Sequence, residues 1–558
     1  MTVIEDIARW VAELSLEDIP ERVLEVARNQ VLSVMGAVHA SAGCAGGRAV
    51  IKTAAALGSD GPCSCYPGGD GRPLDQALLQ NCALSMGLDY DDYLYLGHSG
   101  HSAVCVPLAV GEMVGADTRT VLAAQVAANE VEGRLGASVV LGPHNGQMWA
   151  HIHLLGAAAA ASKVLGLDAE GTADAMGIAM TEPVYALFPG FMGPQSKLLI
   201  AATPAITGTT AAFLAQNGMT GSRSILEDEQ GFWSHFSFVP LPFMMGGLGR
   251  SWVTDTIAFK PYPGCAYIDT AMDALFEILG ALRRERWPHI EVGELRPEEV
   301  RRVRVEASLL TTAMDAMSQA YMDPNKLSPT NINFSLSVSI AIGLLAGELT
   351  GAQLTEEFLD ANRREILSLA SRVELTHSAP LTVGFMRAVD EVTDVKSQLA
   401  QLDMKVLAGA RRRMGEHLSG VATMGRGEAL AAWKSLSPED RSFLRGLVSL
   451  RGLLTRGPEY DLGSSRFDEL VMPFGARVTL ELADGQVLKA QQLIPRGAPG
   501  DPGRFDVPEA KFLREASAFL GLNAARDAVG LMRRIEEHTL EDLRKALTPG
   551  AGREEESK

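Results

Sequence analysis

Apolar residues recur at spacings of three and four over most of the first half of the chain. Those that follow Pro20 in this way are Val23, Leu24, Ala27, Val31, Leu32 and Met35. The spacing predicts a helix that begins near the proline and buries one face. Residues 156–167 are apolar or glycine except for Ser162 and Lys163, which is typical of a helix in a core. We therefore expect helices from residue 3 to about 267.

The pattern changes after Cys265. One more helix is expected at 266–282, and residues 301–307 then alternate as a strand does. The expected strands are 301–307, 372–375, 476–482 and 486–494. The last two flank Asp484-Gly485, a pair that suits a tight hairpin turn. The pattern predicts one antiparallel sheet with helices on one face, an α+β arrangement, before helices return from Lys511 onward.

Charge and composition exclude some functional classes. The chain has 558 residues and a formal net charge of -18. A surface this acidic would repel nucleic acid. It would also repel small anions, so an anionic substrate would need a local positive pocket.

The cysteines and the apolar segments point to a soluble cytoplasmic protein. The six cysteines form no regular framework, which fits a reducing compartment. Residues 1–6 lack the basic and apolar regions of a targeting signal. The apolar stretch 336–346 is too short to span a bilayer. We expect neither a membrane nor a nucleic acid as partner.

Three separated motifs place charges in apolar or Gly/Pro-rich surroundings. They are Leu88-Asp89-Tyr90-Asp91-Asp92-Tyr93, Ser196-Lys197-Leu198-Leu199 and Phe259-Lys260-Pro261-Tyr262-Pro263-Gly264-Cys265. A charge in such surroundings is costly unless it has a partner. The motifs therefore indicate a site for a small polycarboxylic acid, with the two lysines supplying the positive pocket.

The order and spacing of these motifs resemble the MmgE/PrpD family, which includes 2-methylcitrate dehydratase, cis-aconitate decarboxylase and iminodisuccinate epimerase. Further segments that carry the resemblance are 129–135, 156–168, 211–221, 333–336, Asp484-Gly485 and Lys511-Phe512. The resemblance covers most of the chain.

The resemblance implies a mainly α fold with an inserted α+β lid. A large helical domain would comprise residues 1–267 and 511–558, and the lid residues 268–510. A charged helical segment at about 385–470, without site-like features, is longer than the resemblance implies, and it would be an insertion in the lid or an interaction surface. The family commonly forms homodimers and needs no metal or other cofactor, so we expect the same here.

By resemblance, Asp89 is the active-site aspartate, and Lys197 and Lys260 face substrate carboxylates. Asp89 is a candidate general base, or the acid that protonates a leaving hydroxyl. The like charge of a bound polycarboxylate would raise the pKa of Asp89. The two lysines would stabilise charge on an enolate-like intermediate. The alternatives are a capping or solvated role for Asp89 and lysines that extend from the core to water.

Two pairs of histidines lie near positions where the family has histidine. Of His98 and His101 we favour His101, which is closer to Pro107. The sequence does not decide which of His151 and His153 matches the second histidine of the family. Either pair could donate hydrogen bonds or relay protons, and the alternative is a structural role.

Three further residues are weaker substrate-binding candidates. They are Tyr93, where some relatives have threonine, Cys265, which could equally be a small buried hydrophobe, and Tyr321, which could close the pocket from the lid.

The favoured hypothesis is a cofactor-free lyase that acts on a small di- or tricarboxylic acid by dehydration or decarboxylation. An isomerase or epimerase on a similar dicarboxylate is one alternative, and a binding or scaffold subunit that has lost catalysis is another. A metal enzyme is a third, in which His98, His101, His151 and His153 join residues 89–92 as zinc or iron ligands. Their spacing is not a standard one for either metal.

Overall fold

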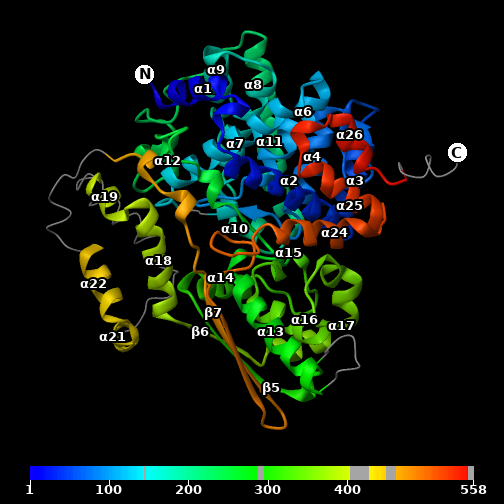
Figure 1. Cartoon of the computed structure of the whole chain (residues 1–558), viewed down its shortest axis with the longest axis vertical. Helices are drawn as coiled ribbons and strands as arrows, with labels where there is room; N and C mark the ends of the chain where they lie inside the picture. The colour runs from blue at the N-terminus through cyan, green and yellow to red at the C-terminus, as the bar shows by residue number, and fades with distance from the viewer. Residues whose placement is uncertain (144–145, 287–294, 403–425, 448–459, 551–558) are drawn as a thin grey trace.

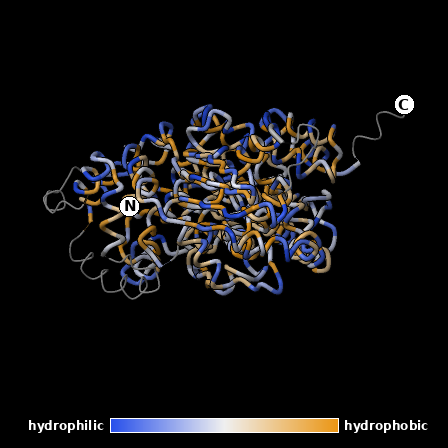
Figure 2. Tube along the Cα trace, turned by 90° about the horizontal axis from the view of Figure 1, so that it is seen from below, coloured by the Kyte–Doolittle hydropathy of each residue, from blue (hydrophilic) through white to orange (hydrophobic). Residues whose placement is uncertain are grey.

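The computed structural model describes residues 1–143, 146–286, 295–402, 426–447 and 460–550. The described chain is mainly helical with a small sheet region, as the sequence predicts. Figure 1 shows helices from both ends of the chain in the upper half and the largest sheet in the lower half. Each half has a hydrophobic cluster of its own. Figure 2, seen from below, shows hydrophobic positions through the middle of the molecule.

The upper half is built from long helices that pack closely on one another. Its elements are α1 (Val3–Glu13), α2 (Glu21–Ala42), α3 (Ala45–Leu57), α4 (Leu74–Met86), α5 (Gly100–Ala103), α6 (Cys105–Val114), α7 (Thr118–Ser138), α8 (Ala150–Val164), α9 (Ala169–Ala179), α10 (Phe188–Phe191), α11 (Leu199–Gln216) and α12 (Phe232–Phe236). The predicted helix near Pro20 is α2, and Pro20 caps it.

Small residues let these helices approach. The five alanines at 157–161 of α8 are completely buried. A methyl group on Gly156 would collide with Glu132 of α7, and one on Gly208 of α11 would collide with the carbonyl of Leu154. Helix α8 therefore packs against α7 and α11 at close range.

The end of the chain returns to the upper half. Helices α24 (Asp506–Leu520), α25 (Leu522–Met532) and α26 (Leu540–Ala546) follow the sheet, and α24 packs along α2. In Figure 1 these red helices lie beside the blue N-terminal ones.

The lower half contains a four-stranded sheet covered by helices. Its elements are α13 (Asp269–Arg286), β5 (Val300–Ala307), α14 (Leu309–Gln319), α15 (Pro329–Ile332), α16 (Leu336–Ala346), α17 (Glu356–Ala370), β6 (Val373–His377), β7 (Ala476–Leu482) and β8 (Val487–Gln492). Alternate residues of β7 are buried, and they join α13 and α16 in one apolar cluster.

The sheet order is β6-β5-β7-β8, and it corrects one expectation. The hairpin β7–β8 and the pair β5–β7 are antiparallel, but β5 and β6 are parallel. The reason is the connection, because α14 to α17 lie between β5 and β6. Such a crossover brings the second strand back in the same direction. The sheet is therefore mixed.

The segment expected to be a helical insertion, 385–470, lies partly outside the described residues, which omit 403–425 and 448–459. Its described part contains α19 (Val395–Ala400), α21 (Arg426–Ser435) and α22 (Pro438–Leu447), beside α18 (Ala379–Thr393). Figure 1 shows these helices at the left edge of the molecule. The domain boundaries themselves stay a prediction.

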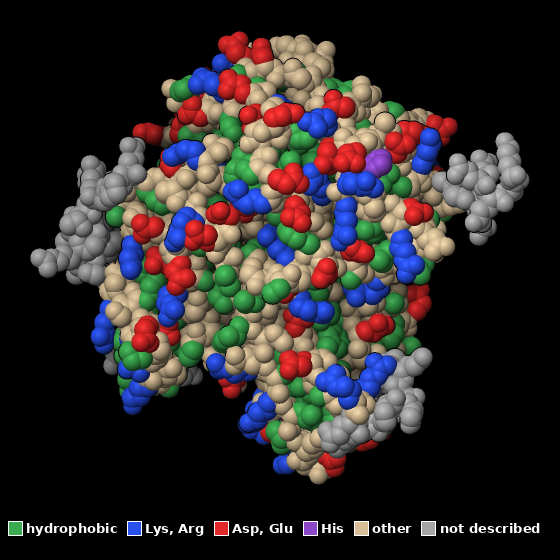
Figure 3. Space-filling model, viewed as in Figure 1, with side chains coloured by type: hydrophobic (Ala, Val, Ile, Leu, Met, Phe, Trp, Pro, Cys, Tyr) green, Lys and Arg blue, Asp and Glu red, His purple; other side chains and the backbone are tan. Residues whose placement is uncertain are grey.

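Two surface features bear on partners. Within the described chain, the stretch Gln195–Gln216 is long and apolar enough to cross a membrane by length and composition, but half of it is buried. It packs on α8 and α9. On the face in Figure 3, acidic and basic side chains are interspersed. The absence of a nucleic-acid partner and the cytoplasmic location stay predictions.

Candidate active site

Two short strands bring the first and third charged motifs together. After α4 the chain turns at Asp89, whose φ of 54° is left-handed, and enters β3 (Asp92–Tyr93). Strand β3 pairs with β4 (Ala258–Phe259), with Asp92 opposite Phe259. Lys260 follows β4 directly, so this pairing places its side chain beside the Asp89 turn.

Lys260 contacts both carboxylates of the turn. Its ammonium donates to the carboxylate of Asp89, to the backbone carbonyl of Asp89 at 2.8 Å, and to Asp91 Oδ1 at 2.8 Å. All three side chains are almost completely buried. The ammonium thus bridges the two aspartates.

Lys197 reaches the same aspartate from the short helix Gln195–Leu198, which directly precedes α11. Its Nζ lies 3.0 Å from Asp89 Oδ2, and the ring of Phe334 lies 4.5 Å from the ammonium. Lys197 is completely buried, so it does not extend to water. Two lysines far apart in sequence therefore converge on one carboxylate.

The charges shift the pKa values of the aspartates downward. Burial raises the pKa of Asp89, but Lys197 and Lys260 outweigh burial and lower it overall. Burial also opposes ionisation of Asp91, yet Lys260 and the neighbouring histidines hold its pKa well below the usual range. The raised pKa that the sequence analysis expects for Asp89 applies only when a polycarboxylate is bound. In this structure Asp89 is ionised.

The lysines differ because their partners differ. Burial lowers the pKa of Lys197 more than its single carboxylate partner raises it. Burial acts on Lys260 too, but two carboxylates raise its pKa overall. Both ammonium groups lie within bonding distance of ionised oxygen, so we assign both as charged.

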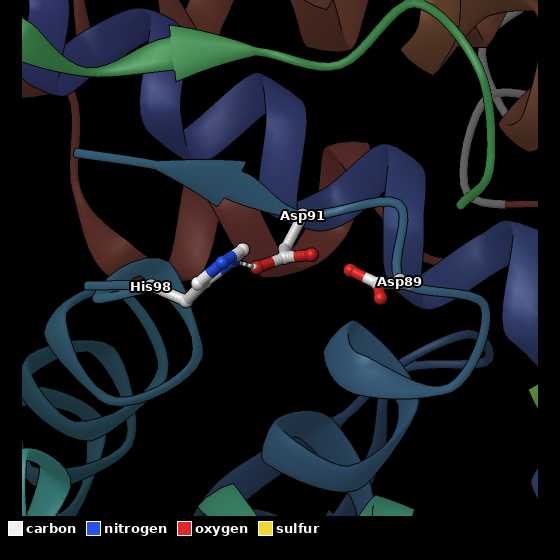
Figure 4. Close-up of side chains that lie close together, drawn as sticks. All are labelled: Asp89, Asp91 and His98. Atoms are coloured by element: carbon white, nitrogen blue, oxygen red, sulfur yellow. Dashed lines mark hydrogen bonds and ion pairs between the residues drawn. The ribbon is translucent and has the colours of Figure 1, made fainter. Parts of the chain in front are cut away.

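Both histidines of the first pair contact Asp91. His98 Nδ1 lies 2.7 Å from Asp91 Oδ2, as Figure 4 shows, and His101 Nε2 lies 3.2 Å from the same oxygen. His101 Nδ1 also lies 2.8 Å from Ser85 Oγ. Burial lowers the pKa of His101 to about 4, so its imidazole is neutral at neutral pH. Neither histidine contacts Asp89 directly.

The two histidines of the second pair, His151 and His153, have different surroundings. His153 is buried behind His101, with ring centroids 5.6 Å apart, and its Nδ1 lies 2.6 Å from Ser102 Oγ and 3.1 Å from Glu132. His151 packs its ring on Phe232 and Phe236. His153 is thus connected to the aspartate cluster through His101, and His151 faces an aromatic group of α12.

The three weaker substrate-binding candidates lie in different surroundings. Tyr93 is buried on β3, with its ring centroid 6.2 Å from that of His98. Cys265 is buried in an apolar group with Phe191 and Phe334, and burial raises its pKa to about 12, so it is a neutral thiol. Tyr321 is 39% exposed and borders Gly193, in the loop before Lys197.

One contact residue was missed by the sequence analysis. Gln147, in the short helix Gly146–Met148, donates from Nε2 to Asp89 Oδ1 at 2.6 Å and to Asp91 Oδ1 at 3.2 Å. A single glutamine in a polar loop gives no sequence signal. Its proximity to His151 in the sequence was the only available hint.

The candidate metal ligands are already neutralised by ammonium groups. Among the described residues, Asp89, Asp91 and His98 offer ligand atoms within 4.8 Å of one another. Lys260 bonds both of these carboxylates, and Lys197 bonds one. A divalent cation would compete with two fixed positive charges for the same oxygens.

The elements around the site are a helical bundle, a covered mixed sheet, and loops that bring two buried lysines onto one aspartate. Together they define a mainly helical protein with a lysine–aspartate centre. The MmgE/PrpD N-terminal domain matches residues 5–240, and the MmgE/PrpD C-terminal domain matches residues 262–416. The chain belongs to the MmgE/PrpD family.

Several curated proteins are similar to this chain. Cis-aconitate decarboxylase of Aspergillus terreus is 24% identical over 396 residues, which cover 67% of this chain and 78% of that protein. The cis-aconitate decarboxylase-like protein oryM of Aspergillus oryzae is 24% identical over 68% of this chain and 80% of its own length. Cis-aconitate decarboxylase of Homo sapiens is 31% identical over 134 residues, 24% of this chain and 27% of that protein.

Proposed function

We propose that the protein is a lyase that acts on a small di- or tricarboxylic acid. The observation that carries the proposal is the convergence of Lys197 and Lys260 on the buried carboxylate of Asp89. Similarity to cis-aconitate decarboxylases of two organisms supports the substrate class.

The site favours chemistry that builds negative charge next to a carboxylate. Removal of a proton or of carbon dioxide from that carbon leaves an electron pair that delocalises into the carboxylate as an enolate. Two ammonium groups in a dry site stabilise this charge strongly. Substrate carboxylates would share or replace the contacts that the lysines now make with Asp89 and Asp91.

Asp89 and the neutral His101 are the proton-transfer groups of the proposal. An ionised Asp89 can accept a proton from the substrate, and a bound polycarboxylate would raise its pKa toward a useful range. His101 is positioned by Ser85, and its Nε2 lies 3.2 Å from the ionised Asp91, which would stabilise a proton taken up by the imidazole. Loss of hydroxide as water gives a dehydratase, and loss of carbon dioxide followed by protonation gives a decarboxylase.

The same intermediate leaves an isomerase as the second candidate, because protonation from the opposite face inverts the carbon. A binding subunit without catalysis is disfavoured by four ionised groups kept buried at a cost. The ammonium contacts of Asp89 and Asp91 disfavour a metal enzyme.

Binding measurements on lysine variants test the proposal. Calorimetric titration of cis-aconitate and citrate should show that Lys197→Met weakens binding by about tenfold or more, since one charge-assisted contact is lost. Lys260→Arg should retain more affinity than Lys260→Met, because it retains the charge. The exposed Lys52 gives the matched control, Lys52→Met. Equal affinity in all variants would place the substrate elsewhere.

A further inference from the structure

Gln147 leaves one buried polar atom without a partner beside the aspartates. Its side chain is 5% exposed, and its Nε2 bonds both Asp89 and Asp91. Its Oε1 has no hydrogen-bond partner within the described chain. The amide NH₂ group of Gln147 thus donates to the two aspartates, and its amide oxygen accepts no hydrogen bond from the described residues.

The orientation of this amide is fixed by its neighbours. Nε2 lies 2.6 Å and 3.2 Å from two carboxylate oxygens. An amide oxygen at these positions would be repelled by both carboxylates, which the lysines keep ionised. The NH₂ group must therefore face the aspartates, and Oε1 must face away from them.

The free acceptor belongs to a side chain that contacts the groups that would hold the substrate. Asp89 Oδ1 accepts from both Gln147 and Lys260, while Asp89 Oδ2 accepts from Lys197. Gln147 is therefore separated from each ammonium by a single carboxylate. A buried carbonyl left without a donor destabilises the folded protein, and native proteins retain such groups mainly where a ligand or water completes them.

We infer that Gln147 is a specificity-determining residue that accepts a hydrogen bond from a substrate hydroxyl, so that the preferred ligand is a hydroxypolycarboxylate. This inference rests on the proposed function and deepens it. Polycarboxylates that lack a hydroxyl, whether saturated or alkenic, would leave Oε1 unpaired. A buried polar group without its partner is the usual basis for strong discrimination between otherwise similar ligands.

Citrate and tricarballylate form a matched pair of probes, since they differ only in the hydroxyl. Calorimetric titration of the parent protein should show that citrate binds about tenfold or more tightly than tricarballylate. The pair malate and succinate should show the same order.

Gln147→Met removes the acceptor and retains the volume, so the citrate preference should fall to about equal affinity for both ligands. The matched control is Gln76→Met. Gln76 is also buried with an unpartnered Oε1, but its Nε2 bonds the carbonyl of Leu57, away from the aspartates. This control should leave the preference unchanged.

Equal affinity of the parent for citrate and tricarballylate would overturn the inference and leave the proposed function intact. A preference that survives in Gln147→Met would overturn it as well. Failure of the parent to bind any of these carboxylates would overturn the proposed function with it. The comparison of ligands on the parent protein needs no variant, so a folding defect in Gln147→Met leaves the inference testable.

Discussion

Asp89 pays a conformational cost to hold its place. A left-handed φ costs a residue other than glycine roughly 1 kcal/mol, less for aspartate than for most. Its amide donates to Met86, and its carbonyl accepts from Lys260 and from the amide of Gly264 at 3.3 Å. These contacts fix the turn and aim the carboxylate at both lysines.

The substitution Asp89→Asn removes the negative charge of the side chain and retains its shape. Asparagine adopts the left-handed region readily, so the turn should persist while the ionised group is lost. We expect turnover of the true substrate to fall by about 100-fold or more, with affinity less affected, because a general base is removed and the lysines are freed. Steady-state kinetics with the exposed Asp75→Asn as control measures both. Full activity in Asp89→Asn would exclude this residue from the chemistry.

His39 provides a pH test away from the site. It is completely buried between Phe512 and Phe519, and burial lowers its pKa from 6.5 to about 4. The folded protein thus prefers neutral His39. Its contribution is complete above pH 6.5 and is lost as the pH falls toward 4.

The free energy of unfolding should therefore fall by about 2 kcal/mol more in the parent than in His39→Leu between pH 7.5 and pH 5. Urea denaturation at the two pH values measures this difference. Parallel pH profiles for the two proteins would show that His39 is not held neutral.

Sequence alone revealed the charged residues of the site but not its uncharged member. Asp89, Lys197 and Lys260 stand out because charges are rare in apolar segments. Gln147 does not, because its role depends on which carboxylates the fold places beside it. Asp91 was visible only as one of three aspartates, and its contact with His98 depends on the turn.

At the scale of elements, one segment near the end of the chain supports both site loops. Residues 496–514 connect the sheet to α24. The carbonyl of Gly497 accepts from Phe259, and Arg504 donates to Asp255 and Ile257. Arg514 donates to Tyr90 and Pro261. The backbone on either side of Lys260 and next to Asp89 is therefore held by this segment.

Lys511 is a buried residue of this segment that contacts the Asp89 turn. Its ammonium donates to Ser33 Oγ at 2.6 Å and to the carbonyl of Tyr90 at 2.7 Å, above the ring of Tyr90. Burial lowers its pKa to about 7, although Asp92 partly opposes this. Lys511 thus fixes the peptide that follows Asp89.

Lys511→Met should reduce kcat by about tenfold with a smaller change in KM, because Asp89 loses its alignment while the lysines remain. The thermal midpoint should change by only a few degrees, since a costly buried amine is replaced by an apolar chain. Arg526→Met on α25 is the exposed control. Parent kcat in Lys511→Met would contradict the role.

The local pattern predicted most elements but not how they pair. The helix after Pro20, the strand at 301–307 and the Asp484-Gly485 hairpin are present because each depends on nearby residues. The parallel pairing of β5 with β6 depends on where the helices between them lead the chain. The alternation of buried and exposed residues along a strand does not indicate the direction of the neighbouring strand.

At the scale of the molecule, two apolar cores meet at the site. The Asp89 turn leaves a helix of the upper half, and Tyr90 packs with the apolar cluster of the lower half. Lys260 and α13 then continue the chain into the sheet. Any relative movement of the two halves would change the geometry of a site at such a junction.

The outward face of α11 is a candidate surface for the predicted homodimer. Residues 199–216 contain no charged side chain, and Leu199 and Leu214 are 45% and 37% exposed. Light scattering after size exclusion should give twice the mass of one chain. Leu214→Lys should lower that mass, and Leu57→Lys, at an apolar position elsewhere that is more exposed (67%), should not. A parent of single-chain mass would contradict the dimer.

The most direct test of the central claim is turnover of a polycarboxylate panel by the parent and by Lys260→Met, followed by mass spectrometry. The proposal predicts that the parent removes water or carbon dioxide from at least one di- or tricarboxylate, and that the variant does so at least about 100-fold more slowly. An unchanged panel with the parent, or an equal rate in the folded variant, would contradict it.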